Sequence, residues 1–166
     1  MLFLRDALVQ DAAAALALEA LRISRASRPR VVVLTIDNLG EVPVFRNSPA
    51  SEKLTRLSMV FNDVLRHQLA GTPVLLVDIG KLLTDARNNP GAIALKNVTS
   101  AACDIESLPF QSVLFCTKQT VVSSDADSTY LYADGLHFTS AGNHLIAEAV
   151  LRALTDKGGE TGRLSR

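Results

Sequence analysis

The segment from Tyr130 to Val150, which begins "YLYADGLHFTSAGNH", places an aspartate and a histidine three residues apart. The pair is Asp134 and His137, directly before a stretch with the pattern of an amphipathic helix. A neutral imidazole can take a proton from a hydroxyl group near neutral pH and return it to a leaving group. A carboxylate that accepts the Nδ1 proton holds the imidazole in one tautomer and stabilises the imidazolium that forms. The pair therefore has the residue types of an oriented general base.

The sequence around the pair is suited to a tight turn. Gly135 allows Asp134 and His137 to face each other across one turn of chain. Thr139 or Ser140 can cap the following helix and anchor the turn at one end. Taken alone, the same spacing also fits a surface hydrogen bond or a contact of a helix cap, and these interpretations stay open at this point.

The other two histidines have structural explanations. His144 falls on the polar face expected for the final helix, where Glu148 can pair with it at i, i+4. His67 lies near the end of an earlier predicted helix, where a histidine interacts favourably with the helix dipole. A metal site at His137 lacks a third ligand in the neighbouring sequence. His137 is therefore the histidine that carries candidate chemistry.

The elements that would position this turn alternate between helix and strand. The Ala- and Leu-rich segment Ala7–Ser27 is predicted to be a helix that Pro29 ends. The β-branched runs Arg30–Asp37 and Pro73–Gly80 are typical of strands buried in a parallel sheet. The residues expected to share one face of the first helix are Leu8, Leu16, Ala20 and Ile23.

A second helix, Ser51–Ala70, connects the two predicted strands, and Gly71 ends it. Its apolar side is expected to consist of Leu54, Leu57, Val60, Phe61, Val64 and Leu65. A short helix from Lys81 is stopped by Asn88, Asn89 and Pro90. The pattern then weakens into a long irregular region, residues 91–129, before a final helix over residues 140–154 and a tail, 156–166, expected to be disordered. The class is α/β.

Length and charge limit the function classes. The chain of 166 residues is long enough for one domain. Seventeen basic and seventeen acidic residues cancel, so no basic surplus indicates a nucleic acid or an anionic membrane as partner. No apolar run reaches the ~18 residues of a transmembrane segment. Three acidic residues interrupt the apolar start, which is predicted to be a helix rather than a signal peptide.

Two cysteines, Cys103 and Cys116, lie in the irregular region with 12 residues between them. They can be two buried thiols, as in a cytosolic protein, or one disulfide, which would indicate an oxidising compartment. Their spacing matches neither a CxxC redox motif nor a zinc site. Both interpretations stay open on the residues alone.

The segment "YADGLHFTSAGNHLIAEAVLRAL" resembles the last block of the SGNH, or GDSL-type, ester hydrolases. In that family an Asp-x-x-His-x-Thr turn before the C-terminal helix supplies two members of a Ser-His-Asp triad. The resemblance implies these roles for Asp134 and His137, within a three-layer α/β/α, flavodoxin-like fold with a parallel sheet. It further implies hydrolysis of an ester or lipid substrate with no metal or organic cofactor.

Earlier segments agree with the family in order. "VVVLTIDNLGEVPVF" resembles the strand and loop after the third block, although a proline common near Asp37 is absent. Phe61, Asn62 and Leu65 resemble family positions on the following helix. "NVTSAAC" resembles the lipase-like, secreted branch, which often pairs this cysteine with a later one. The resemblance thus implies a Cys103–Cys116 disulfide and a secreted or periplasmic location, for which this chain carries no signal peptide.

The family's Gly-Asp-Ser and Gly-x-Asn-Asp blocks do not occur in this sequence, whose first glycine is Gly40. The resemblance therefore implies that residues 1–155 are the C-terminal portion of an SGNH domain. The nucleophile, the oxyanion donors and the N-terminal strands would lie upstream. The local serines Ser48, Ser51, Ser123 and Ser124 lack the sharp strand-to-helix elbow of a nucleophile and are expected to serve turns and caps.

Two further interpretations compete with this one. The chain can be a catalytically inactive SGNH-like module that binds a partner, or that forms a homo-oligomer through an exposed sheet edge. The strand, helix, strand pattern also suits a nucleotide-binding fold. That fold needs a Gly-rich turn between strand and helix, and the sequence has none.

Overall fold

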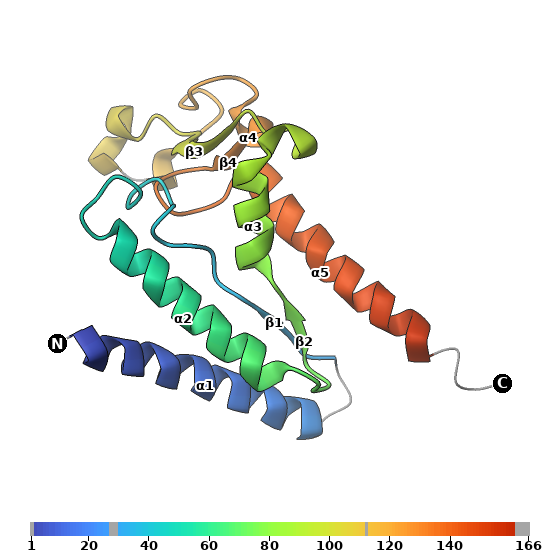
Figure 1. Ribbon diagram of the computed structural model, residues 1–166. Coiled ribbons are helices and arrows are strands. Elements are labelled where there is room, and N and C mark those ends of the chain that lie inside the picture. The colour runs from blue at the N-terminus through green and yellow to red at the C-terminus, as the bar shows by residue number, and fades with distance from the viewer. Residues whose placement is uncertain (1, 27–29, 112, 162–166) are drawn as a thin grey trace. The chain divides into compact units, whose positions relative to one another are not determined.

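The computed structural model describes residues 2–26, 30–111 and 113–161 (Figure 1). Within them lie helices α1 (Leu2–Ala26), α2 (Ser51–Leu69), α3 (Ile79–Asn88), α4 (Ala126–Thr129) and α5 (Ser140–Thr161). The strands are β1 (Val32–Leu34), β2 (Leu75–Val77), β3 (Asn97–Ala101) and β4 (Tyr130–Tyr132). β1 pairs with β2 and β3 pairs with β4, both in parallel. The predicted α/β class with parallel strands is confirmed.

The chain divides into two compact units. Unit 1 comprises residues 1–37, 56–81 and 147–166, and unit 2 comprises residues 38–55 and 82–146. Unit 1 contains the β1–β2 pair, and unit 2 contains the β3–β4 pair with the Asp134–His137 turn.

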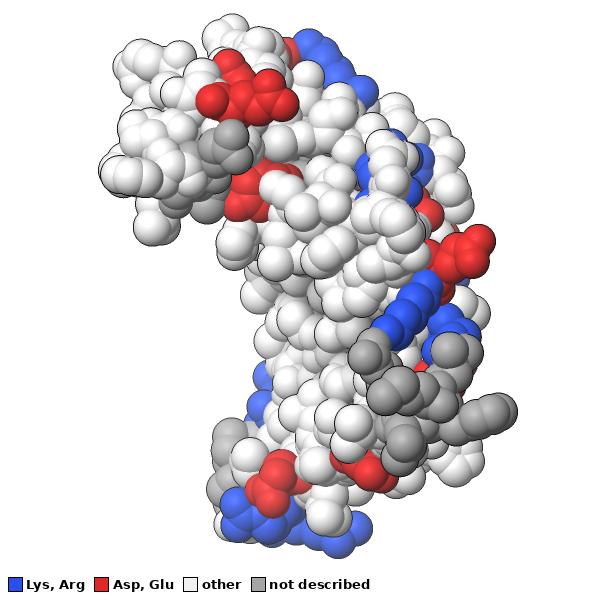
Figure 2. Space-filling model, turned by 90° about the vertical axis from the view of Figure 1, so that its left-hand side faces the viewer, with Lys and Arg blue, Asp and Glu red and all other residues white. Residues whose placement is uncertain are grey.

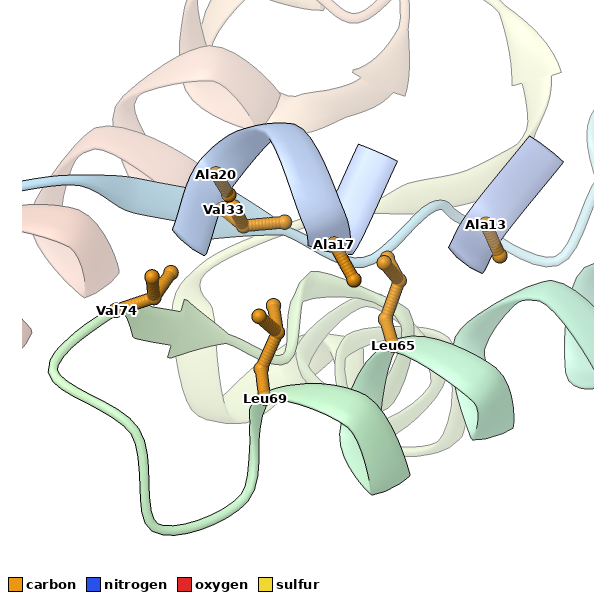
Figure 3. Packing of buried hydrophobic residues seen from close by; sticks show 7 residues of the cluster. All are labelled: Ala13, Ala17, Ala20, Val33, Leu65, Leu69 and Val74. Carbon is orange, nitrogen blue, oxygen red and sulfur yellow. The ribbon is translucent and has the colours of Figure 1, made fainter. Parts of the chain in front are cut away.

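The core of unit 1 forms where α1 packs on α2 and the first strand pair (Figure 3). Ala13, Ala17 and Ala20 of α1 are buried against Leu65 and Leu69 of α2, with valines from the strand segments. Alanine at three successive positions of one face lets two helix backbones approach closely. Of the four residues expected to share one face of this helix, only Ala20 is buried, and Leu8, Leu16 and Ile23 are exposed.

The buried face of α2 also differs from the predicted one. Leu65 is fully buried as expected, but Ser58 and Asn62 are buried beside it. The buried amide of Asn62 has hydrogen-bond partners. Its Oδ1 accepts from the N–H of Ile36 at 2.8 Å, and its Nδ2 donates to the Ile36 carbonyl at 2.8 Å. A helix side chain thus satisfies the backbone just beyond β1, as a neighbouring strand would.

Polar side chains also hold the carboxyl ends of β1 and β2 together. Thr35 donates to Asp78 at 3.0 Å, and Arg66 donates to both oxygens of the same carboxylate, at 2.8 and 3.1 Å. Burial alone would raise the pKa of Asp78. The hydrogen bonds from Arg66, the Lys81 N–H and Thr35 outweigh this effect, so the pKa lies below its usual value. The carboxylate is therefore held ionised between the two strand ends.

Unit 2 contains elements that the sequence pattern did not predict. The region 91–129 was expected to be irregular, yet its described residues include β3, α4 and several short 3-10 turns. β3 has the sequence NVTSA, which is mostly polar and lacks the apolar pattern typical of a strand. The Oδ1 of Asn97 accepts hydrogen bonds from the N–H groups of Thr99 and Ser100. The strand follows from pairing with β4, which is distant in sequence, and not from local propensity.

Several helix boundaries agree with the sequence pattern. α2 begins at Ser51 as predicted, α3 ends at Asn88, and Gly71 follows α2 with a φ of 69°. α1 begins at Leu2, earlier than Ala7, and its predicted end at Ser27 and Pro29 lies outside the described residues. α5 runs to Thr161, so it is longer than predicted, and the last five residues of the expected tail also lie outside the described residues.

Candidate active site

Asp134 and His137 face each other across the turn between β4 and α5 in unit 2. The Nδ1 of His137 lies 2.7 Å from the Oδ2 of Asp134, within hydrogen-bond distance. The other carboxylate oxygen, Oδ1, accepts from the backbone N–H of Leu136 at 2.7 Å and of His137 at 2.6 Å. With Nδ1 bonded to a carboxylate, the tautomer that carries its proton on Nδ1 is favoured, and Nε2 is then a proton acceptor.

The two side chains of the pair differ in burial. The side chain of Asp134 is 11% exposed, and that of His137 is 69% exposed. Burial alone would raise the pKa of Asp134. The hydrogen bonds from the backbone N–H groups of His137 and Leu136, and then the interaction with the imidazole, outweigh this effect, so the pKa lies below its usual value. The carboxylate therefore stays ionised at neutral pH and the imidazole remains accessible.

The turn is closed by contacts on both sides of the pair. The N–H of Ala133 donates to the carbonyl of His137 at 2.8 Å, and Tyr132 forms an antiparallel bridge with Phe138. The rings of Tyr132 and Phe138 are stacked with centroids 5.4 Å apart. The hydroxyl of Tyr132 accepts a hydrogen bond from Arg87 at 2.8 Å, so the buried ring is fixed both by stacking and through its hydroxyl group. The aromatic pair fixes the residues that flank the turn.

Thr139, and not Ser140, caps the final helix. Its Oγ1 accepts from the N–H of Gly142 at 3.1 Å and donates to the carbonyl of Tyr130, and the residue is 3% exposed. This hydroxyl satisfies an N–H of the first helical turn that would otherwise have no partner. The cap ties the start of α5 to β4, so both ends of the turn are fixed to the same strand.

Gly135 is required by close packing and not by an unusual backbone angle. A Cβ at this position would lie 2.9 Å from the Cβ of Val44, which is shorter than normal contact. The N–H of Val44 donates to the carbonyl of Gly135 at 3.0 Å. The loop around Val44 therefore lies against the turn, and Val44 itself is 55% exposed. Sequence reasoning missed this neighbour because about 90 residues separate the two positions.

Three of the four local serines make turn contacts, and Ser124 lies in the wall of a cavity in unit 2. Ser48 accepts from the N–H of Ala50, Ser51 donates to the carbonyl of Gly40, and Ser123 donates to Asp125. These are the turn contacts that the sequence predicts for such serines. His67 lies in the last turn of α2, and His144 is exposed on α5, where Glu148 accepts from Arg152 at 3.1 Å.

The structure contains a disulfide between Cys103 and Cys116, with Cα atoms 6.0 Å apart. This is the pairing that the family resemblance implies, and it rules out the alternative of two free thiols. The disulfide lies in the wall of a cavity of about 670 Å³ in unit 2. Other parts of the wall come from residues that flank the turn, Ala133 and Thr139.

Charges and ligand groups add few constraints. In the space-filling view, acidic and basic side chains both occur, and neither sign forms one continuous patch (Figure 2). Across residues 2–26, 30–111 and 113–161, no three His, Cys, Asp or Glu side chains are grouped as metal ligands would be. Nor does any helix in this part of the chain combine the length and apolar content of a membrane span.

Comparison with known proteins gives two related sequences, both from Arabidopsis thaliana. GDSL esterase/lipase At4g01130 is 27% identical over 116 residues, which are 62% of this chain and 30% of that protein. GDSL esterase/lipase At5g22810 is 25% identical over 135 residues, or 74% of this chain and 37% of that protein. The chain thus spans about a third of the length of these curated relatives. No family model matches the chain.

The two relatives bear the family name that residues 132–154 suggested, and the matched stretches cover much of the chain. The parallel α/β architecture is consistent with the fold of that family. The resemblance of this chain to the GDSL, or SGNH-type, esterase/lipases is therefore confirmed.

Proposed function

We propose that this chain supplies the general base and its orienting carboxylate to a GDSL-type ester hydrolase. His137 is the base and Asp134 is the carboxylate. The nucleophilic serine and the oxyanion donors come from sequence outside these 166 residues. The observation that carries the proposal is the 2.7 Å contact between Nδ1 of an exposed imidazole and Oδ2 of a buried carboxylate.

In the first half of the reaction, Nε2 of His137 takes the proton of the serine hydroxyl as its oxygen attacks the ester carbonyl carbon. The imidazolium then donates this proton to the oxygen of the departing alcohol. The products of this half are an acyl-serine and a free alcohol. Asp134 stays ionised throughout, and its attraction for the charged ring stabilises the imidazolium.

In the second half, Nε2 takes a proton from a water molecule as its oxygen attacks the acyl carbon. The imidazolium returns that proton to the serine oxygen when the carboxylic acid leaves. One ester and one water thus give one acid and one alcohol, and His137 ends as it began. The exposure of the ring fits a group that must meet both substrates.

Two further observations support the proposal. The relatives carry the name GDSL esterase/lipase, which describes an ester substrate class. Three of the four serines considered as local nucleophiles have hydroxyl groups engaged in turns, which leaves them without the geometry of a nucleophile beside a base. We therefore expect the 166-residue chain alone to hydrolyse no ester above background.

The test is ester hydrolysis by the full-length polypeptide that contains this sequence together with an upstream Gly-Asp-Ser segment. His137→Ala should lower kcat by roughly 10⁴- to 10⁶-fold, the range seen when a triad member is removed. His144→Ala, at an exposed histidine on α5, is the matched control and should leave activity within about twofold. Full activity in the His137→Ala protein would refute the assignment.

A further inference from the structure

The Cys103–Cys116 disulfide lies next to the strand that carries the turn. Cys103 is buried, at 5% exposure, and follows β3. Its backbone N–H donates to the carbonyl of Ala133 at 2.9 Å, and the N–H of Ala102 donates to the carbonyl of Tyr132 at 2.8 Å. Beyond the end of β3, these bonds connect the chain to β4 and to the residue immediately before Asp134.

From Ala133 the connection continues into the turn. The N–H of Ala133 donates to the carbonyl of His137 at 2.8 Å. Both backbone groups of Ala133 are thus engaged, one by Cys103 and the other by His137. Two successive hydrogen bonds therefore connect the disulfide-bonded residue Cys103 to the histidine.

The other end of the disulfide lies in a segment whose described apolar side chains are mostly exposed. Leu108 is buried, but Phe110 is 93% exposed, Leu114 is 87% exposed and Phe115 is 45% exposed. Phe110 also has a φ of 55°, which is unfavourable for an aromatic residue. These three exposed side chains contribute little apolar burial to the segment, so its covalent bond to Cys103 is a major constraint.

The base of this segment closes back onto the end of β3. The N–H of Asp104 donates to the carbonyl of Thr120, and the N–H of Val122 donates to the carbonyl of Ala102, both at 2.9 Å. Cys103 and Val121 form an antiparallel bridge. Backbone contacts at its base and the disulfide thus both connect this segment to Cys103 and its neighbours.

We propose that the Cys103–Cys116 disulfide is a positioning element for the Asp134–His137 pair. It keeps the end of β3 in register with Ala133, and Ala133 in turn holds the carbonyl of His137. Without the disulfide, the turn opens more often and the imidazole samples orientations in which Nδ1 is not bonded to Asp134. The importance of this for catalysis rests on the proposed function, whereas the effect on the turn does not.

The effect on the turn can be measured on the 166-residue chain by NMR. The probes are amide hydrogen exchange at Ala133, Leu136 and His137, and the ¹⁵N shifts that report which ring nitrogen of His137 carries the proton. In the Cys103→Ala/Cys116→Ala protein, exchange at these amides should become at least about tenfold faster. The Nδ1-protonated tautomer should lose its dominance.

Two references separate positioning from general stability. The amides of Thr35 and Leu75, which bond to Val77 and Val31 in unit 1, should exchange within about twofold of their original rates. Thr120→Val removes a hydroxyl that accepts from the Thr117 N–H in the same segment but leaves the disulfide intact. This variant should change neither the exchange at His137 nor its tautomer.

If the double variant does not fold, the folded natural chain can be treated with dithiothreitol. Reduction transfers two electrons and two protons, which gives two cysteine thiols and the oxidised cyclic dithiol. Faster exchange at all amides alike, or unchanged exchange and tautomer at His137, would overturn the proposal.

The same double variant in the full-length polypeptide separates this inference from the proposed function. If His137→Ala retains esterase activity, the proposed function fails even where the NMR effect is present. If His137→Ala is inactive but the disulfide variant has unchanged exchange and tautomer, the positioning proposal fails and the proposed function stands.

Discussion

The two units of this chain stabilise a pair of parallel strands in different ways. In unit 1, β1 and β2 lie beneath a packed layer in which the alanines of α1 meet the leucines of α2. In unit 2, β3 and β4 are held by a disulfide, a stacked aromatic pair and a buried threonine cap. Unit 2 also has buried apolar residues, such as Leu83 and Leu131, but its specific contacts lie near the candidate site, whereas the helix packing of unit 1 lies around the first strand pair.

This difference suits the role that we propose for the Asp134–His137 pair in unit 2. A proton-transfer pair must be held within a few tenths of an ångström, and hydrogen bonds and cross-links are directional where apolar packing is not. The contacts of unit 2 converge on five successive residues, 133–137. The comparison predicts that changes in unit 1 act on stability and that changes in unit 2 act first on the geometry of the pair.

The largest expected effect is on activity, from a change inside the turn. Asp134→Asn in the full-length polypeptide should lower kcat by about 10⁴-fold, because the amide no longer fixes the imidazole tautomer. Asp63→Asn, at an exposed carboxylate of unit 1, is the control and should leave kcat unchanged. Ester hydrolysis under saturating substrate measures both, and equal losses would contradict the assignment.

The next effect is on stability, from the core of unit 1. Leu65→Ala removes a fully buried side chain between α1 and α2 and should cost about 2–5 kcal/mol in the free energy of unfolding. Urea denaturation measures the cost. Met59→Ala, at a 59% exposed position of the same helix, should cost under about 0.5 kcal/mol. A small loss in Leu65→Ala would show that unit 1 does not depend on this packing.

Loss of the disulfide should have an intermediate effect on stability. The two cysteines are 13 positions apart, and a loop of this size corresponds to about 3 kcal/mol of stabilisation, chiefly through the unfolded chain. Thermal unfolding of the oxidised chain and of the Cys103→Ala/Cys116→Ala variant measures it. An unchanged Tm would mean that the cross-link does not constrain unit 2.

A smaller effect is expected at the cap of α5. Thr139→Ala removes the hydroxyl bonded to Gly142 and Tyr130 and should cost about 1–2 kcal/mol. Thr155→Ala removes an exposed hydroxyl that donates to the Leu151 carbonyl within the same helix, and it should cost under about 0.5 kcal/mol. Equal costs at the two positions would argue against the cap as an anchor of the turn.

The smallest effect concerns pH and involves both units. The pKa values of Asp134 and Asp78 are lowered in the folded chain, so each carboxylate contributes stability that is present above the unfolded pKa, near 3.8. This contribution is lost as the pH falls from about 5 through the folded pKa values. In urea titrations between pH 7 and pH 3, the free energy of unfolding should fall less steeply in Asp134→Asn than in the natural chain. Parallel curves would contradict the assignment.

Much of unit 1 could be predicted from the sequence. The β-branched runs around Val33 and Leu76 and the start of α2 at Ser51 agree with the structure, because periodicity and caps are local signals. The apolar residues that the sequence groups on one face of α1 are not its buried residues, apart from Ala20. Leucine is the more hydrophobic residue, but the three small alanines allow the helices to approach.

Less of unit 2 could be predicted, and for a physical reason. The Asp134–His137 pair and the Thr139 cap are local motifs, so the sequence indicated both. β3 depends on its partner β4, and the contact between Val44 and Gly135 joins distant segments. Nothing in the residues near Gly135 indicates Val44. The spacing of the two cysteines alone did not distinguish a disulfide from two free thiols, and only the resemblance to a family favoured the disulfide.

The buried amide of Asn62 bears on how the first strand pair can grow. Successive backbone groups of a strand point to opposite sides, and the N–H of Thr35 points to β2. The groups of Ile36 that Asn62 occupies therefore lie on the outer side of β1. A further strand on that side could form backbone hydrogen bonds with β1 only as far as Leu34. The side chain of Asn62 therefore limits how far such a strand could pair along β1.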